Sequence, residues 1–201
     1  EMSASLVGSE MCIRDSIRAV ENEILSSKIC RCFDCRQVLY EESMFDGQKV
    51  SKSRIITSVD YSMVSMEAFE IYATNHDIHV MDFVLKLDAY SYYMMNLLDY
   101  LIGNTDRHWG NWGFLVDNRT NQPVRLFDLM DLNQTFLAYD TPDGANCMTT
   151  GNRKMSQREA AVEAVKNIGL NQKDEIKDEW FKGREKEREM FWCRFGILKE
   201  Q

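Results

Sequence analysis

A short polar stretch, residues 103–111, carries the side-chain types that phosphoryl transfer requires. Asp106 is a carboxylate that can accept the proton of an attacking hydroxyl. Asn111, five residues later, offers an amide oxygen, a hard ligand of the kind that Mg²⁺ prefers. His108 lies between them and is expected to order the loop through hydrogen bonds rather than to transfer a proton. The stretch therefore predicts one arm of a phosphoryl-transfer site.

A second acidic cluster is expected to supply the other arm. Asp128 and Asp131 follow a predicted β-hairpin, with strands at residues 112–116 and 124–127 around a polar turn. The first strand leads away from Asn111, and the second brings the chain back to the same end. Both aspartates are therefore candidates for a second metal ligand.

The loop also has a simpler interpretation, in which residues 104–106 cap a helix while His108 and Asn111 fill hydrogen bonds of a turn. The pattern Asn-x-Asp-x-His-x-x-Asn nevertheless fixes four identities. At an average usage of about one in twenty each, a chance match in a chain of this length is rare. The strand pair that ends in aspartate strengthens the functional interpretation.

An apolar helix is predicted to deliver this loop. Residues 79–102 keep helical spacing for almost their whole length, and Asp77 is expected to cap the helix. The apolar stripe is interpreted as a buried core face. It consists of Phe83, Leu87, Tyr90, Met94, Leu98 and Leu101.

Upstream, the pattern predicts a helix at 17–33, β segments at 38–40 and 50–59 around a turn at 45–48, and a short helix at 65–74. Downstream, Ser156 and Glu159 form a capping-box pattern for a helix at 157–167, which Gly169 ends. A charged helix is predicted at 174–195. Its inward side is expected to carry Trp180, Phe191, Trp192 and Phe195, and its solvated side Lys182, Arg184, Lys186 and Arg188.

The composition is that of an ordinary globular chain. With 201 residues, 44% hydrophobic and 28% charged, it can form one good-sized domain or two unequal lobes. The net charge of −8 argues against nucleic acid as a direct partner. No apolar run approaches the ~20 residues of a membrane span, and no secretory signal is recognisable, so a cytoplasmic protein is expected.

Cys30, Cys32 and Cys35 crowd the end of the first helix and invite comparison with a zinc site. A structural zinc site takes four ligands, however, and His76 and His79 are distant in sequence. Buried or half-buried free thiols are therefore expected. Residues 1–16 fit nothing that follows, and we interpret them as a sequence artefact without a role.

Taken together, these motifs resemble the HipA-like kinases, which are related to phosphatidylinositol kinases and protein kinases. Residues 103–111 look like the family's catalytic loop, and 131–136 are similar to its metal-binding Asp-Phe-Asn segment. The resemblance implies an α+β, protein-kinase-like fold with a mostly helical C-lobe. It places a partial N-lobe at 17–60 and the C-lobe, with the catalytic-loop hairpin, at 61–201.

The resemblance also implies roles for individual residues. Asp106 would position the acceptor hydroxyl, while Asn111 and Asp131 would hold Mg²⁺; Asp131 is favoured over Asp128 for its flanking sequence. Glu23, with Glu21 as the second candidate, would be the glutamate that pairs with an ATP-binding lysine. Ser51, Lys52 and Ser53 would lie near the adenine of ATP, and either Lys28 or Lys52 could be offered as a substitute lysine.

Two expected parts of an ATP site are not recognisable. Gly8 is the only glycine before Gly47, and no lysine precedes Glu23, so the glycine-rich loop and the lysine strand are missing. The chain is interpreted as an N-terminally truncated kinase fragment with impaired ATP binding.

The resemblance further implies a protein substrate with a serine or threonine acceptor, and an antitoxin-type partner. No membrane contact and no direct nucleic-acid contact are expected. The main alternative is a kinase-like binding module without catalysis. A metal-dependent phosphohydrolase using His108 is a weaker alternative, because no second histidine motif could build a two-metal site.

Overall fold

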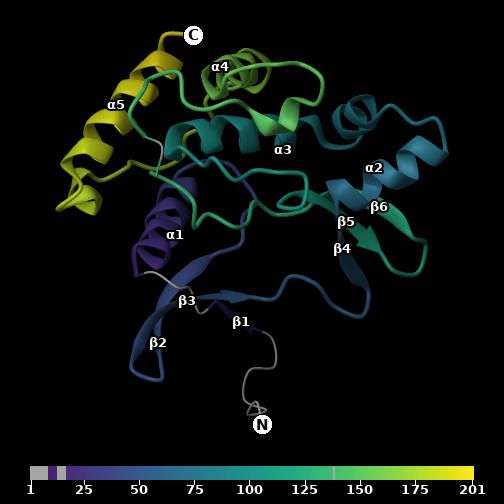
Figure 1. Cartoon of the computed structure of the whole chain (residues 1–201), viewed down its shortest axis with the longest axis horizontal. Coiled ribbons are helices and arrows are strands. Elements are labelled where there is room, and N and C mark those ends of the chain that lie inside the picture. The colour runs from purple at the N-terminus through teal and green to yellow at the C-terminus, as the bar shows by residue number, and fades with distance from the viewer. Residues whose placement is uncertain (1–8, 13–16, 138) are drawn as a thin grey trace.

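The computed structural model describes residues 9–12, 17–137 and 139–201, which form five α-helices, six strands and two 3₁₀ turns. The elements are β1 (Ser9–Cys12), α1 (Ile17–Cys30), β2 (Tyr40–Phe45), β3 (Gln48–Arg54), β4 (Tyr61–Ser65), α2 (Met66–Asn75), α3 (Val80–Ile102), β5 (Gly113–Asp117), β6 (Gln122–Leu126), η1 (Met148–Thr150), α4 (Gln157–Ile168), η2 (Asp178–Phe181) and α5 (Glu185–Lys199). Figure 1 shows β1 to β3 at one end of the molecule and α4 with α5 at the opposite end. Most of the segment interpreted as an artefact lies outside the described residues.

The first sheet is antiparallel with the order β1-β3-β2. The predicted turn is confirmed, and Asp46 and Gly47 form it with positive φ angles of 48° and 74°. The predicted strand bounds were inaccurate, because β2 starts only at Tyr40 and β3 ends at Arg54. Val38 instead donates its amide to the carbonyl of Leu129, which ties the start of this hairpin to the chain that precedes Asp131.

Helix α1 ends at Cys30, three residues before its predicted end. Cys30 and Cys32 are buried and Cys35 is half-buried, all as free thiols. Burial raises the pKa of each thiol, that of Cys35 to about 12. Within residues 17–137 and 139–201, no three His, Cys, Asp or Glu side chains gather closely enough to hold a metal ion.

Helix α3 confirms the long predicted helix, although its cap is different. His79 is the N-cap, and its ring nitrogen accepts the amide of Asp82. Asp77, the predicted cap, has φ 54° and belongs to the turn before the helix. The C-terminal part of the predicted stripe is fully buried, whereas the part from Phe83 to Tyr90 is half-buried against the core.

A kink interrupts α3 at Asp88, whose φ of −155° and ψ of 64° lie outside the helical region. The Asp88 carboxylate accepts the amide of Ser91 and, from outside the helix, the amide of Leu126 and the guanidinium of Arg36. Polar contacts within and beyond the helix thus stabilise the kink.

The second sheet has the order β4-β5-β6 and is also antiparallel. The predicted hairpin around residues 117–123 is confirmed, while β4 was not predicted. β4 passes so close to β5 that a Cβ on Gly113 would lie 2.1 Å from the carbonyl oxygen of Val64. Only glycine fits at this crossing.

The C-terminal region contains one confirmed and one wrong prediction. The capping box of Ser156 and Glu159 forms at the start of α4 as predicted. The single helix predicted at 174–195 is wrong: η2 is followed by a turn with φ 74° at Gly183, and α5 begins at Glu185. Arg184, predicted to face solvent, is buried.

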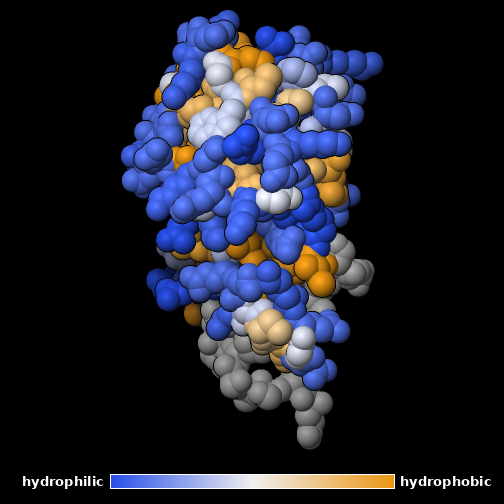
Figure 2. Space-filling model, turned by 90° about the vertical axis from the view of Figure 1, so that its left-hand side faces the viewer, coloured by the Kyte–Doolittle hydropathy of each residue, from blue (hydrophilic) through white to orange (hydrophobic). Residues whose placement is uncertain are grey.

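One hydrophobic core joins α1, α3, α4, α5 and the second sheet, and it includes Phe191 and Phe195 of α5. Trp180 and Trp192 are half-buried at its edge. Figure 2 shows mainly hydrophilic residues on the side of the molecule that carries α1, β2 and α5, with small hydrophobic patches between them. Every helix in the described part of the chain falls short of the length or the apolar content that crossing a bilayer takes.

Candidate functional site

The loop that carries Asp106 begins at an unusually tight helix end. Gly103 closes α3 with φ 61°, and a Cβ at this position would lie 2.3 Å from the ring of Tyr139. Asn104 is buried, donates to the Asp99 carboxylate at 3.0 Å and accepts the Asp106 amide at 3.1 Å. The contacts at Gly103 and Asn104 thereby fix the backbone conformation that leads to Asp106.

Asp106 and Asn111 lie in direct contact. The Asn111 side-chain amide donates to the backbone carbonyl of Asp106 at 2.9 Å and to its carboxylate at 3.4 Å. Because the Nδ2 group faces Asp106, the Oδ1 atom of Asn111 faces the other way. The structure therefore brings the predicted base and the predicted amide ligand together.

Arg107 connects this loop to the chain that carries Asp131. Its buried guanidinium forms a two-point ion pair with Asp99, with distances of 2.8 and 3.0 Å. The Nη1 atom also donates to the carbonyl of Asn111 at 2.8 Å and to the carbonyl of Met130 at 2.7 Å. Two carbonyls that share one donor must lie close together, so Asp131, directly after Met130, is held beside the loop.

The electrostatics of Arg107 agree with this placement. Burial alone would lower the pKa of its guanidinium, but the carboxylate of Asp99, with a smaller contribution from Asp131, raises the pKa above its ordinary value. Arg107 therefore stays charged in a buried setting. No role for Arg107 was predicted from the sequence. An aspartate in the last turns of an otherwise apolar helix, such as Asp99, is the signal that could have indicated its partner.

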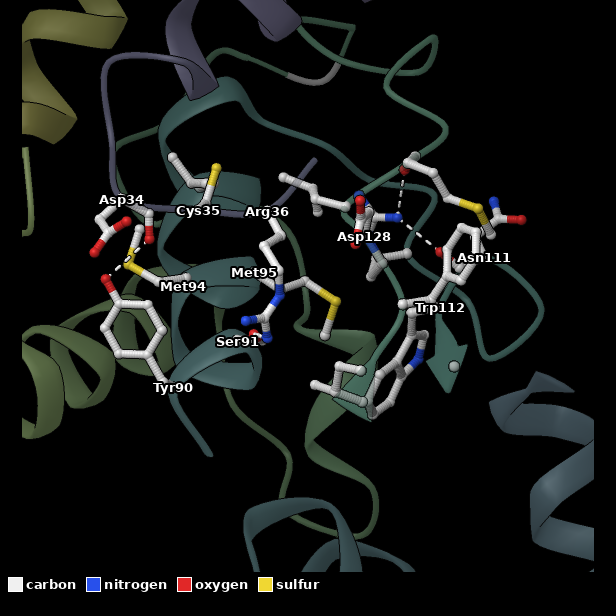
Figure 3. Close-up of a pocket in the computed structure, with 17 residues that line it drawn as sticks. Asp34, Cys35, Arg36, Tyr90, Ser91, Met94, Met95, Asn111, Trp112 and Asp128 are labelled. Atoms are coloured by element: carbon white, nitrogen blue, oxygen red, sulfur yellow. Dashed lines mark hydrogen bonds between the residues drawn. The ribbon is translucent and has the colours of Figure 1, made fainter. Parts of the chain in front are cut away.

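The two candidate aspartates have different surroundings. Asp128 pairs with Arg125 at 2.5 Å and lines a pocket of about 190 Å³ together with Asn111 and Trp112. Figure 3 shows Asp128, Asn111 and Trp112 at one end of this pocket, with Asp34 and Tyr90 at the other. Asp131 is half-buried with φ 53°, and its amide donates to the Tyr40 hydroxyl at 3.1 Å. The Asp128 carboxylate is therefore engaged by an arginine side chain.

His108 is half-exposed beside Asp106. Its Nδ1 accepts the amide of Gly110 at 3.0 Å, and its Nε2 lies 3.9 Å from the Asp106 carboxylate. A side chain on Gly110 would meet the His108 ring at 2.8 Å. These contacts show that His108 shapes the turn between Asp106 and Asn111.

Of the residues expected around a nucleotide, one group is buried between α1 and β3, and the two lysines are exposed. Glu23 is fully buried on α1, and its carboxylate accepts the hydroxyl of Ser51; Ser53 also faces inward from β3. Lys52 lies between these serines, is exposed, and points to the opposite side of the strand. Lys28 is also exposed, on α1.

Glu21, the second candidate for the pairing glutamate, is only half-buried. It contacts Arg184 at 3.3 Å and Lys49 at 3.9 Å. The Glu21 carboxylate therefore lies between Arg184 and Lys49 of β3, whereas the Glu23 carboxylate binds Ser51.

A cleft of about 200 Å³ lies where β3 ends, near the predicted nucleotide-facing backbone. One side is the chain from Ser53 to Thr57, and the other side includes Met63, Phe127 and Met130. Mostly apolar walls with a few polar groups are typical of small-molecule sites. Met130 adjoins Asp131, so this cleft lies next to residues 131–135, which we call the acidic segment.

The donor set of the site suits Mg²⁺. Asn111 and Asp131 would supply one amide oxygen and one carboxylate, both hard ligands. Mg²⁺ commonly takes only one or two side chains and completes its shell with water and phosphate oxygens. The residues present therefore fit a magnesium ion that is held together with a phosphate group.

Comparison with known proteins gives a structural match only. No protein-family model matches the sequence, and the search of curated proteins found no similar sequence. The structure is similar to the crystal structure of the Helicobacter pylori proinflammatory kinase CtkA, with a TM-score of 0.70 and 12% sequence identity. The match covers 96% of this chain and 84% of that chain. The chain therefore has a kinase-like fold.

Proposed function

We propose that this chain is the phosphoryl-transfer part of a HipA-like protein kinase, which transfers the γ-phosphoryl group of ATP to a serine or threonine hydroxyl of a protein. The observation that carries the proposal is the double hydrogen bond of Arg107 to the carbonyls of Asn111 and Met130. It gathers Asp106, Asn111 and Asp131 at one place in a kinase-like fold, and this is the set that such a reaction needs.

In this proposal each residue has a separate task. Asp106 accepts the hydrogen bond of the acceptor hydroxyl and takes its proton as the new P–O bond forms, while the bond from the γ-phosphorus to ADP breaks and ADP leaves. Asn111 and Asp131 would hold Mg²⁺, which would neutralise charge on the phosphate oxygens. His108 keeps the turn between them in shape. The buried hydrogen bond between Ser51 and Glu23 supports the nucleotide-binding side of the site.

The nucleotide is proposed to enter the cleft at the end of β3. Its base would meet the backbone of residues 53–57, with Met63 and Phe127 opposite. Lys52 is exposed between the buried Ser51 and Ser53, so its side chain leaves β3 on the side opposite to Ser51, the partner of Glu23.

The choice of metal ligand is part of the proposal. Asp131 is favoured because it follows Met130 directly and lies close enough to Arg107 to affect its pKa. Asp128 is already engaged by Arg125. Asp131→Asn and Asp128→Asn are matched variants, since each removes one charge from the same segment.

A nucleotide-binding experiment tests the proposal. A ligand that binds only the folded state raises the midpoint of thermal unfolding. ADP should raise this midpoint in the presence of Mg²⁺ and not in the presence of EDTA; Asp131→Asn should abolish the rise and Asp128→Asn should keep it. The proposal is wrong if saturating Mg²⁺ and ADP leave the midpoint unchanged. Loss of the rise in Asp128→Asn alone would reassign the metal ligand.

The proposal also includes a cytoplasmic location and the partners that the resemblance implies, a protein acceptor and an antitoxin-type partner. Incubation with radiolabelled ATP and candidate acceptors, followed by phosphoamino-acid analysis, would identify the acceptor hydroxyl. Label on serine or threonine supports the proposal, and label on another residue type contradicts it.

A further inference from the structure

The side chain of Asn22 contacts two parts of the chain that are far from it in sequence. It lies on α1 and is fully buried. Its Oδ1 atom accepts a hydrogen bond from Nη1 of Arg184 at 2.8 Å, and its Nδ2 atom donates to the carbonyl of Thr135 at 2.6 Å. Arg184 immediately precedes α5, and Thr135 belongs to the segment that begins at Asp131. One amide group therefore joins α1, the acidic segment and the C-terminal helix.

Further buried contacts connect α1 to the acidic segment. The hydroxyls of Ser26 and Thr135 lie 2.8 Å apart, and the Thr135 hydroxyl also donates to the carbonyl of Leu132 at 2.8 Å. Thr135 thereby closes the turn behind Asp131. Ser26 and Thr135 are both fully buried, so each lost hydrogen bond would leave an unsatisfied polar group away from water.

Two more contacts attach the start of α5 to α1. Arg184 also reaches the carboxylate of Glu21 at 3.3 Å, and Arg18 forms an ion pair with Glu187. Glu23 follows Asn22 on the same helix and is buried against Ser51. The position of Glu23 therefore depends on a helix that the C-terminal region holds in place.

We infer that Asn22, Thr135 and Arg184 are positioning residues, through which the C-terminal helix α5 holds Glu23 and Asp131 at a fixed separation. The catalytic role of these residues rests on the proposed function, whereas the structural link between α5 and α1 does not. If it holds, loss of Arg184 loosens α1 and the segment from Asp131 to Thr135 together and leaves the rest of the fold in place.

Hydrogen exchange on the full chain tests the link. Arg184→Met keeps the aliphatic length of the side chain and removes its donors. Loss of a buried hydrogen bond of this kind should speed exchange of the α1 amides by on the order of tenfold, while the α4 amides keep their rates. Arg188→Met is the matched control, since Arg188 lies on α5 and pairs with Asp178 of η2 at the surface, and it should leave α1 unchanged. Unchanged α1 exchange in Arg184→Met, or equal acceleration in α4, overturns the inference.

Variants of Thr135 provide a second, independent test. Thr135→Val removes the hydroxyl at nearly constant volume and should speed α1 exchange, whereas Thr135→Ser keeps the hydroxyl and should restore near-native rates. Because α1 contacts Arg184 through Asn22 and the Thr135 hydroxyl through Ser26, Arg184→Met and Thr135→Val should combine non-additively. Additive effects, or equal behaviour of the Val and Ser variants, contradict the bridge.

Nucleotide binding separates the inference from the proposed function. If the native chain binds ADP with Mg²⁺, Arg184→Met should weaken that binding several-fold and Arg188→Met should not. Unchanged affinity together with faster α1 exchange would overturn the positioning role. If the native chain binds no nucleotide, the proposed function fails, and the exchange measurements still decide whether α5 holds α1.

Discussion

The side-chain amide of Asn111 donates hydrogen bonds to both the backbone carbonyl and the carboxylate of Asp106, at 2.9 and 3.4 Å. The predicted base and the predicted metal ligand are therefore not independent groups. A change that shifts one of them also shifts the other, so kinetic effects at these two positions should not simply add.

Replacing Asp106 by Asn is expected to slow phosphoryl transfer by about 10²–10⁴-fold, because a general base contributes rate enhancements of this size. The backbone carbonyl that Asn111 binds remains, so the thermal midpoint and the circular dichroism spectrum should stay close to those of the native chain. Initial rates of ³²P transfer measure the effect. A rate within tenfold of native, with Mg²⁺ present, would remove Asp106 from the proposed mechanism.

Replacing Arg107 by Met should destabilise the fold strongly. Asp99 would remain buried without its charged partner, which typically costs about 3–5 kcal/mol. Urea denaturation gives the free energy of unfolding. Arg119→Met is the control, because Arg119 pairs with Asp60 on the surface, where an ion pair contributes less than about 1 kcal/mol. Similar losses in the two variants would mean that the buried pair contributes little.

Gly103 and Gly47 both have positive φ angles, of 61° and 74°, but Gly103 is crowded and Gly47 is not. Gly103→Ala would place its methyl group 2.3 Å from the ring of Tyr139, whereas nothing lies within 4 Å of a methyl group on Gly47 in the β2–β3 turn. Both variants carry the strain of a left-handed backbone, about 1–2 kcal/mol, and Gly103→Ala should cost a further ~1–3 kcal/mol from overpacking. Equal unfolding free energies of the two variants would show that the loop entrance relaxes freely.

Stability should fall at alkaline pH. Burial raises the pKa of Cys35, Tyr92 and Tyr100 to about 12, above their ordinary values of 9.0 and 10.0. The folded state therefore binds more protons than the unfolded state in this range, so this contribution to stability is complete below about pH 9 and is lost as the pH rises toward 12. Unfolding free energies measured from pH 8 to 11.5 should decline accordingly, and Tyr100→Phe should make the decline shallower. A free energy of unfolding that does not change with pH above pH 9 would contradict the raised pKa values.

Local sequence patterns predicted the elements whose signals lie within one segment. The apolar period of residues 79–102, the polar turn at 117–123 and the capping box at Ser156 each act over a few neighbouring residues. All three were found where the pattern placed them, with boundaries shifted by a residue or two. The contact between Asp106 and Asn111 followed as well, because a tight loop brings these two positions together.

Features set by long-range contacts were missed. β4 is short and half-buried, and it is a strand because it pairs with β5, far along the chain. Gly183 interrupts the charged helix where Arg184 turns inward to reach Asn22, and no local pattern marks an arginine for burial. Asp77 and His79 are both reasonable caps, and the left-handed backbone at Asp77 decided between them.

The kink of α3 also constrains how this protein can vary in length. Asp88 fastens the helix to β6 through the Leu126 amide, and Asp99 fastens it to the loop through Arg107. Between these two anchors the helix sets a distance of about 16 Å, at 1.5 Å per residue. One residue inserted between them would turn Asp99 by about 100° away from Arg107, whereas an insertion before the kink leaves both anchors in register. Related chains should therefore vary in length ahead of Asp88 and keep the spacing between Asp88 and Asp99 constant.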